Sequence, residues 1–151
     1  MEKEMTTFEV KTNDGLLAVR LPAGRYAISD PCYSARDDIY DENLFTGDHE
    51  DVFPLNFRYD NDGLYGVGAK TDVGDGMYAG SSGFSYSVDS GMIGVVSDAA
   101  VRDEARDDPN VMFHDFKNGV EVSNSNGLIT IYDVADDGSA TVFEQIDTVY
   151  D

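Results

Sequence analysis

The chain has 151 residues, 41% hydrophobic and 11% aromatic, and no apolar run long enough to cross a bilayer. This length and composition predict a single domain spanning residues 1–151 and exclude global disorder. Thirty acidic residues against ten basic ones give a formal net charge of -20. Such a surface repels phosphate, and this argues against direct binding to nucleic acid or to a membrane.

The N-terminal residues and the cysteine content predict a cytoplasmic location. Residues 1–10 carry Glu2, Glu4 and Glu9, whereas an export signal has a cationic start followed by an apolar core. Cys32 is the single cysteine and cannot form an intramolecular disulfide.

Alternating apolar and polar residues, typical of strands with one buried face, recur in the first half of the chain. They predict strands at Phe8–Val10, Leu16–Leu21, Tyr26–Ile28, Phe53–Tyr59 and Leu64–Lys70. Asn-Asp-Gly turns separate the first two strands and the last two, and therefore predict two hairpins. Because proline cannot donate to a central ladder, Pro54 places its strand at a sheet edge.

The middle of the chain is less regular. Ser34–Asp51 lacks periodicity and predicts a loop with one helical turn near Asp38–Phe45, whereas the glycines between Gly66 and Gly94 predict tight turns and bulges. Met92–Val96 predicts a short buried strand. The one helix is expected at Ser97–Asp107, with Ser97 as its cap.

The last third predicts a meander of strands joined by Asn-Gly and Asp-Gly turns. Its expected strands are Val111–Phe116, Val120–Ser123, Leu128–Val134 and Thr141–Tyr150. No alternation of strands with helices indicates a parallel sheet. The predicted fold is therefore mainly β (a β-rich α+β arrangement): an antiparallel sheet, sandwich or small barrel with one short helix near residues 97–107.

Cys32 is a candidate nucleophile, with His49 or His114 as its base. Such pairs are recognised by geometry, and a small side chain packed after a strand is the preferred interpretation. The sequence predicts no catalytic residue.

Acidic glycine loops offer carboxylates to a hard cation, but Asp-Gly and Asn-Gly are also the commonest hairpin turns. The loops are residues 60–63, 72–76 and 136–138, and none completes a calcium-binding loop. The glycine pattern near Gly74 and Gly76 lacks a nucleotide fingerprint, and with 30 acids no particular carboxylate pair indicates a glycosidase. No metal or cofactor is predicted.

The acidity is itself a candidate functional feature, because closely spaced carboxylates can imitate a phosphate array. Turn chemistry accounts for part of the aspartate, and adaptation to high salt is the other alternative. The acids expected to form this surface are Asp37, Asp38, Asp41, Asp48, Asp51, Asp60, Asp62, Asp103, Asp107, Asp108, Asp136 and Asp137.

Three blocks between Leu21 and Val96 resemble a family of small uncharacterised proteins from bacteriophage and bacterial genomes. They are Gly24-Arg25-Tyr26 with Ser29-Asp30-Pro31-Cys32-Tyr33, then Gly74-Asp75-Gly76-Met77-Tyr78, then Val88-Asp89-Ser90-Gly91-Met92-Ile93-Gly94. In place of Ser29 the family often has glycine, and it has a tryptophan that this chain lacks. The candidate binding site that these blocks share is Asp30, Cys32, Tyr33, Asp75, Tyr78 and Asp89.

The resemblance implies a small accessory protein of a phage or mobile element, acting in the host cytoplasm. The favoured hypothesis is a non-enzymatic protein that binds and inhibits a basic host protein, such as a defence or nucleic-acid enzyme, through an acidic, DNA-mimicking surface. One alternative is a small hydrolase or metal-binding module centred on Cys32 and the Asp-Gly loops. Another is a virion or assembly component that associates through sheet edges. The sequence leaves the oligomeric state open.

Overall fold

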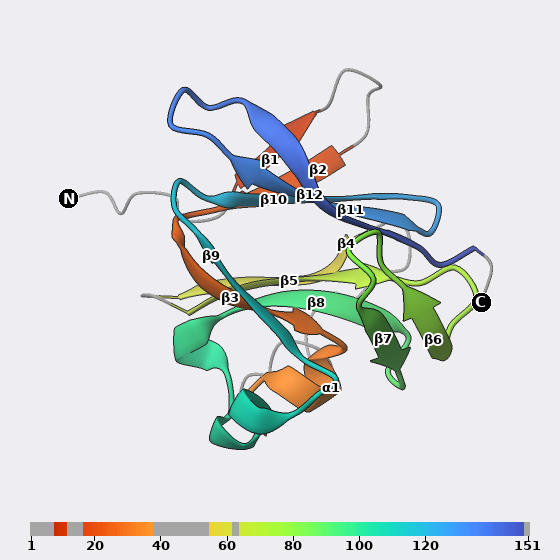
Figure 1. Cartoon of the computed structure of the whole chain (residues 1–151). Coiled ribbons are helices and arrows are strands. Elements are labelled where there is room, and N and C mark those ends of the chain that lie inside the picture. Colours follow the sequence, from red (N-terminus) through yellow and green to blue (C-terminus); the bar gives the residue numbers. More distant parts are fainter. Residues whose placement is uncertain (1–7, 12–16, 38–54, 62–63, 150–151) are drawn as a thin grey trace.

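The computed structural model describes residues 8–11, 17–37, 55–61 and 64–149, and these form two stacked antiparallel sheets and a separate hairpin (Figure 1). The first sheet has the order β1-β2-β10-β11-β12. Its strands are β1 (Phe8–Lys11), β2 (Leu17–Leu21), β10 (Val120–Ser125), β11 (Leu128–Val134) and β12 (Ala140–Asp147). Both the β1–β2 hairpin and the β10–β11–β12 meander therefore form as expected.

The second sheet lies beneath the first in Figure 1 and has the order β4-β5-β8-β3-β9. Its strands are β3 (Gly24–Ser29), β4 (Leu55–Asn61), β5 (Leu64–Lys70), β8 (Met92–Ser97) and β9 (Met112–Phe116). Strand β4, which follows Pro54, is an edge strand as predicted. Of the architectures that the sequence left open, the structure has stacked sheets and not a closed barrel.

The core fills the space between the two sheets. Its fully buried members include Val19 and Ile131 from the first sheet and Ile28 and Val95 from the second. Phe116 packs edge-on against Tyr26, with ring centroids 6.0 Å apart. Burial of these apolar faces is the main force that holds the sheets together.

The glycine-rich stretch contains a hairpin that the sequence did not predict as strands. Strand β6 (Gly76–Ala79) pairs with β7 (Ser85–Val88) and lies at one end of the sandwich, on the right in Figure 1. Glycine weakens the strand pattern, so the formation of this hairpin depends on its tertiary contacts.

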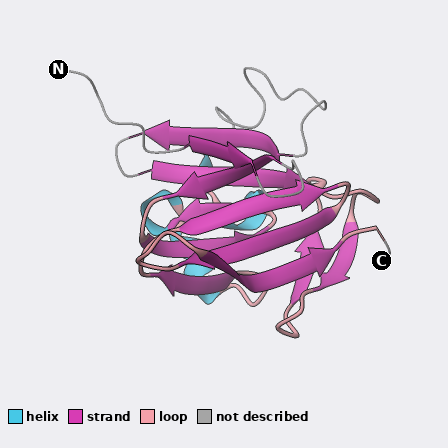
Figure 2. Ribbon diagram, turned by 90° about the horizontal axis from the view of Figure 1, so that it is seen from above, coloured by secondary structure: helices cyan, strands magenta, loops and turns pink. Residues whose placement is uncertain are grey.

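The helical segments lie on the outer side of the second sheet (Figures 1 and 2). The helix expected near residues 97–107 is resolved into two 3₁₀ turns, η1 (Asp98–Ala100) and η2 (Asp103–Asp107). They are separate because Val101 and Arg102 are extended between them. A four-residue helix, α1 (Pro31–Ser34), was not predicted, and the predicted turn at Asp38–Phe45 lies outside the described residues.

The expected pairing of Val111–Phe116 with the next strand is wrong. Strand β9 pairs with β3 in the second sheet, whereas β10 pairs with β2 and β11 in the first. The chain changes sheets at Gly119, whose φ of +124° glycine tolerates far better than other residues. No helix of the described residues is long and apolar enough to span a bilayer.

Candidate binding site

Asp30 is a buried carboxylate that joins two of the sequence blocks. It caps α1, and its Oδ1 accepts hydrogen bonds from the Cys32 N–H at 2.8 Å and the Ser90 hydroxyl at 2.6 Å. Its Oδ2 accepts the N–H groups of Asp89 and Ser90, both at 2.6 Å. Because the side chain is fully buried, these four donors replace water around its charge. Asp30 thereby fixes α1 to the turn between β7 and β8.

Tyr33 and Asp89 form the exposed part of the same junction. The Tyr33 hydroxyl donates to Oδ2 of Asp89, and this hydrogen bond is the main reason why the pKa of Tyr33 is raised. Asp89 is exposed, whereas its backbone N–H is held by the buried Asp30. The structure therefore brings together Asp30, Cys32, Tyr33 and Asp89 from the predicted site.

Cys32 lies in this junction but its environment opposes thiolate chemistry. Burial, followed by the nearby charge of Asp30, raises the pKa of its thiol to about 12. A thiol with this pKa is protonated at neutral pH, whereas a cysteine nucleophile acts as the thiolate. The geometry thus favours a packing role for Cys32.

We expect Cys32 in the folded protein to react at least ~100-fold more slowly with Ellman's reagent at about pH 8 than an unperturbed cysteine. The reason is its small thiolate fraction, which follows from the raised pKa. The same protein unfolded in urea is the control, since Cys32 is the only thiol in the chain. A folded-state rate within about tenfold of the unfolded-state rate would contradict this environment.

The other two predicted site residues have different positions. Tyr78 is buried in the core on β6, and its hydroxyl donates to the Gly74 carbonyl at 2.7 Å. Asp75 is exposed in the loop that leads into β6. Tyr78 is therefore a structural residue of the hairpin, while Asp75 belongs to its surface.

A second buried carboxylate, Glu144, anchors the other end of the hairpin, and no motif in the sequence pointed to it. Its Oε1 accepts the Ser81 hydroxyl at 3.0 Å and the Ser82 N–H at 2.8 Å. Its Oε2 accepts the hydroxyls of Ser82 at 2.7 Å and Tyr86 at 2.5 Å. Burial is the main cause of the raised pKa of Tyr86, with the Glu144 hydrogen bond second. Gly80 contacts the carboxylate so closely that an added Cβ would lie 2.4 Å from Oε2.

The outward side of the β6–β7 hairpin is a small surface, which we call the hairpin face. It consists of Met77, Ala79, Ser85 and Ser87, because Met77 pairs with Ser87 and Ala79 with Ser85 across the two strands. Met77 is 58% exposed, whereas Tyr78 and Tyr86 on the opposite side are buried. Both ends of the hairpin are held by a buried carboxylate, so this face is rigidly presented.

Three exposed acids lie in the segments that flank the hairpin face: Asp72, Asp75 and Asp89. Among the residues that the structure describes, no lysine or arginine forms a salt bridge with any of them. Val73, 49% exposed, adds apolar surface in the same loop. The surroundings of the hairpin therefore combine apolar area with carboxylates that have no basic counterpart in the described chain.

The arginines are concentrated elsewhere, around the two 3₁₀ turns. Arg25 and Arg106 lie over the Phe113 ring, at 5.1 and 5.8 Å from its centroid, and both contact Asp98. Arg102 forms an ion pair with Asp37 at 3.0 Å. These arginines are matched by acids, so they do not form a surface for phosphate.

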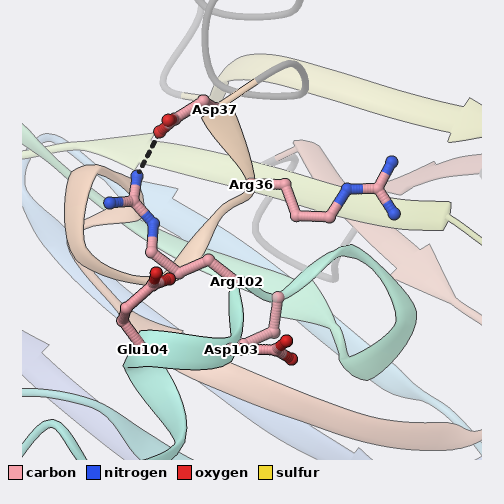
Figure 3. Close-up of a pocket in the computed structure, with 6 residues that line it drawn as sticks. Arg36, Asp37, Arg102, Asp103 and Glu104 are labelled. Atoms are coloured by element: carbon pink, nitrogen blue, oxygen red, sulfur yellow. Dashed lines mark hydrogen bonds and ion pairs between the residues drawn. The ribbon is translucent and has the colours of Figure 1, made fainter.

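A cleft of about 320 Å³ lies beside these turns, and Figure 3 shows the side chains that line it. Arg102 points to Asp37, whereas Arg36 extends away from both, and its guanidinium donates to the Ala99 carbonyl at 3.3 Å. Asp103 and Glu104 complete the polar lining. With both signs of charge in its wall, the cleft selects no particular ligand.

The structure describes only part of the predicted acidic surface. Asp37, Asp103, Asp107, Asp136 and Asp137 are exposed and Asp108 is half-buried, while Asp60 is described by its backbone in β4. The members outside the described residues are Asp38, Asp41, Asp48, Asp51 and Asp62. Within the described ranges, no three His, Cys, Asp or Glu side chains are grouped to hold a metal ion.

Comparisons of the chain with protein-family models, with curated proteins and with solved structures gave no significant match.

Proposed function

We propose that the protein is a non-enzymatic inhibitor that binds a basic partner protein through the hairpin face and the acids around it. The observation that carries this proposal is the local imbalance of charge. Asp72, Asp75 and Asp89 are exposed in the segments that flank the hairpin, Met77 is 58% exposed, and Arg25, Arg102 and Arg106 pair with other acids. A partner with lysine or arginine would supply the missing counter-charges.

The chemistry of the hairpin face favours a protein as the partner. Methionine and tyrosine are residue types enriched at protein interfaces, and the small side chain of Ser87 lies next to both Met77 and Tyr33. Carboxylates repel phosphate, so a nucleic acid is a poor ligand for this surface. An enzyme that binds nucleic acid has a basic groove, which an acidic DNA mimic would occupy.

The rigidity of the hairpin supports the same function. Asp30 holds the exit of β7 and Glu144 holds the β6–β7 turn, each through four hydrogen bonds. A preorganised surface loses little conformational entropy on binding, which increases affinity. The proposed setting is a phage or mobile-element protein that acts on a host defence or nucleic-acid enzyme in the host cytoplasm.

The test is affinity capture from a bacterial lysate, with three versions of the immobilised protein. The hairpin variant carries Asp72→Lys and Asp75→Lys, whose side chains are exposed. The matched control carries Asp103→Lys and Asp107→Lys on η2, which changes the net charge by the same amount outside the segments that flank the hairpin. Bound proteins are identified by mass spectrometry at physiological salt and at about 0.5 M salt, where the screening length is about half its physiological value.

We expect the wild type and the η2 control to capture the same basic protein, and the hairpin variant to lose it. The capture should also weaken at the higher salt concentration, because the contact is electrostatic. Retention of the protein by the hairpin variant would refute the proposed surface. Failure of the wild type to capture any basic protein would refute the function.

A further inference from the structure

Strand β12 has one free edge in its first half. It is the outermost strand of the first sheet and pairs with β11 on its other side. Its second half is covered by the hairpin turn, because Ser81 donates its N–H to the Gln145 carbonyl and accepts the Gln145 N–H, both at 2.9 Å. No other described segment pairs with the first half, Ala140 to Phe143.

The register of the sheet shows which backbone groups this edge presents. Val134 donates its N–H to the carbonyl of Gly119, on the β10 side, at 3.1 Å. The backbone N–H and C=O groups of the preceding residue, Asp133, therefore point toward β12, where Asp133 pairs with Thr141. Alternation along β12 then directs the N–H and C=O groups of Ala140 and Val142 away from the sheet. The Val142 side chain is also 56% exposed.

A cleft of about 360 Å³ opens beside this edge. Thr141 of β12 lines it, together with Asp133 of β11, His114 and Asp115 of β9, and Lys117. The His114 ring stacks on Phe143 with a centroid distance of 4.2 Å, and Asp115 contacts Arg25 at 3.4 Å. Asp136 and Asp137 are exposed in the turn that leads into β12. The side of the molecule next to the free edge therefore carries an excess of carboxylates.

We propose that the free half of β12 binds an extended, lysine- or arginine-containing segment of the partner as an additional strand. The outward N–H and C=O groups of Ala140 and Val142 supply the backbone hydrogen bonds. A basic side chain of the added strand enters the cleft next to Asp133. This inference rests on the proposed function, since it specifies how a basic partner also engages a second surface. Pairing of two copies of this chain is disfavoured because each carries a net charge of -20.

The probe for the test is a fluorescein-labelled peptide of alternating lysine and valine, about eight residues long, measured by fluorescence anisotropy. A second peptide is N-methylated at every residue, so that neither of its edges can donate to a strand. Val142→Pro removes the outward N–H without removing a hydrogen bond to β11, and Val142→Thr is its matched control. Amide exchange of Val142 in the wild type gives a measurement that needs no variant.

If the peptide adds as a strand, the Val142→Pro variant should bind the unmodified peptide at least about tenfold more weakly than the wild type does. The wild type should bind the methylated peptide more weakly by a similar factor. The Val142→Thr variant should bind the unmodified peptide within about twofold of the wild type. The unmodified peptide should also slow exchange of the Val142 amide. Equal affinities for the two peptides, or unchanged exchange at Val142, would overturn the inference. If peptide binding were lost only in the Asp72→Lys/Asp75→Lys variant and not in Val142→Pro, strand addition at β12 would be overturned. The hairpin face would still stand as the proposed functional surface.

Discussion

Replacing Asp30 with alanine is expected to lower the free energy of unfolding by about 3–5 kcal/mol. The substitution leaves the backbone N–H groups of Cys32, Asp89 and Ser90 without their acceptor, in a place where the native side chain excludes water. It also removes the cap of α1. Urea denaturation followed by circular dichroism measures the change, and the alanine variant should have a lower midpoint with a similar slope.

Asp75→Ala is the matched control for this result. Asp75 is exposed, so its loss should change the unfolding free energy by no more than about 0.5 kcal/mol. The comparison separates a structural carboxylate from a surface one within the same sequence blocks. A cost below about 1 kcal/mol for Asp30→Ala would show that its hydrogen bonds do not stabilise the junction.

Replacing Glu144 with alanine is expected to cost a similar amount, about 3–5 kcal/mol, at the other end of the hairpin. The hydroxyls of Ser81, Ser82 and Tyr86 and one N–H group lose their acceptor. Gly80→Ala should cost about 1–3 kcal/mol without removing any of these groups, because its Cβ would clash with the Glu144 carboxylate. Thermal and urea denaturation of the two variants measure these costs.

Two milder substitutions calibrate the Glu144 result. Ser81→Ala removes one donor to the carboxylate and should cost about 1 kcal/mol. Glu104→Ala, on the exposed η2 turn, should have no effect beyond about 0.5 kcal/mol. If Glu144→Ala were no more destabilising than Ser81→Ala, the carboxylate would not be the anchor of the hairpin turn.

Both anchors matter for the proposed function because the hairpin face depends on them. The face has no core of its own, since its outward residues are small or exposed. A variant that loses either carboxylate should therefore lose partner binding together with stability. Charge reversal at Asp72 and Asp75 should instead remove binding with little loss of stability, which separates the contact surface from its support.

The sequence by itself determined the strands with regular alternation and the turns between them. Phe8–Val10 with Leu16–Leu21, and Leu128–Val134 with its neighbours, form hairpins because Asn-Gly and Asp-Gly turns restrict adjacent strands to antiparallel pairing. Pro54 also predicted that its strand lies at a sheet edge. This could be predicted from the sequence because proline itself lacks the backbone N–H that a central strand needs. The motifs grouped Asp30, Cys32, Tyr33 and Asp89 in one candidate site, but they did not show how these residues contact one another.

Only the tertiary structure decided the sheet exchange at Gly119, the β6–β7 hairpin and the role of Glu144. A β-bulge in β12 allows Phe143 and Glu144 both to face inward, whereas simple alternation from Phe143 would expose the carboxylate. Its donors come from Ser81, Ser82 and Tyr86, about 60 residues away in the chain. Pairings over such distances depend on the packing of the whole chain, so local periodicity and turn chemistry cannot specify them.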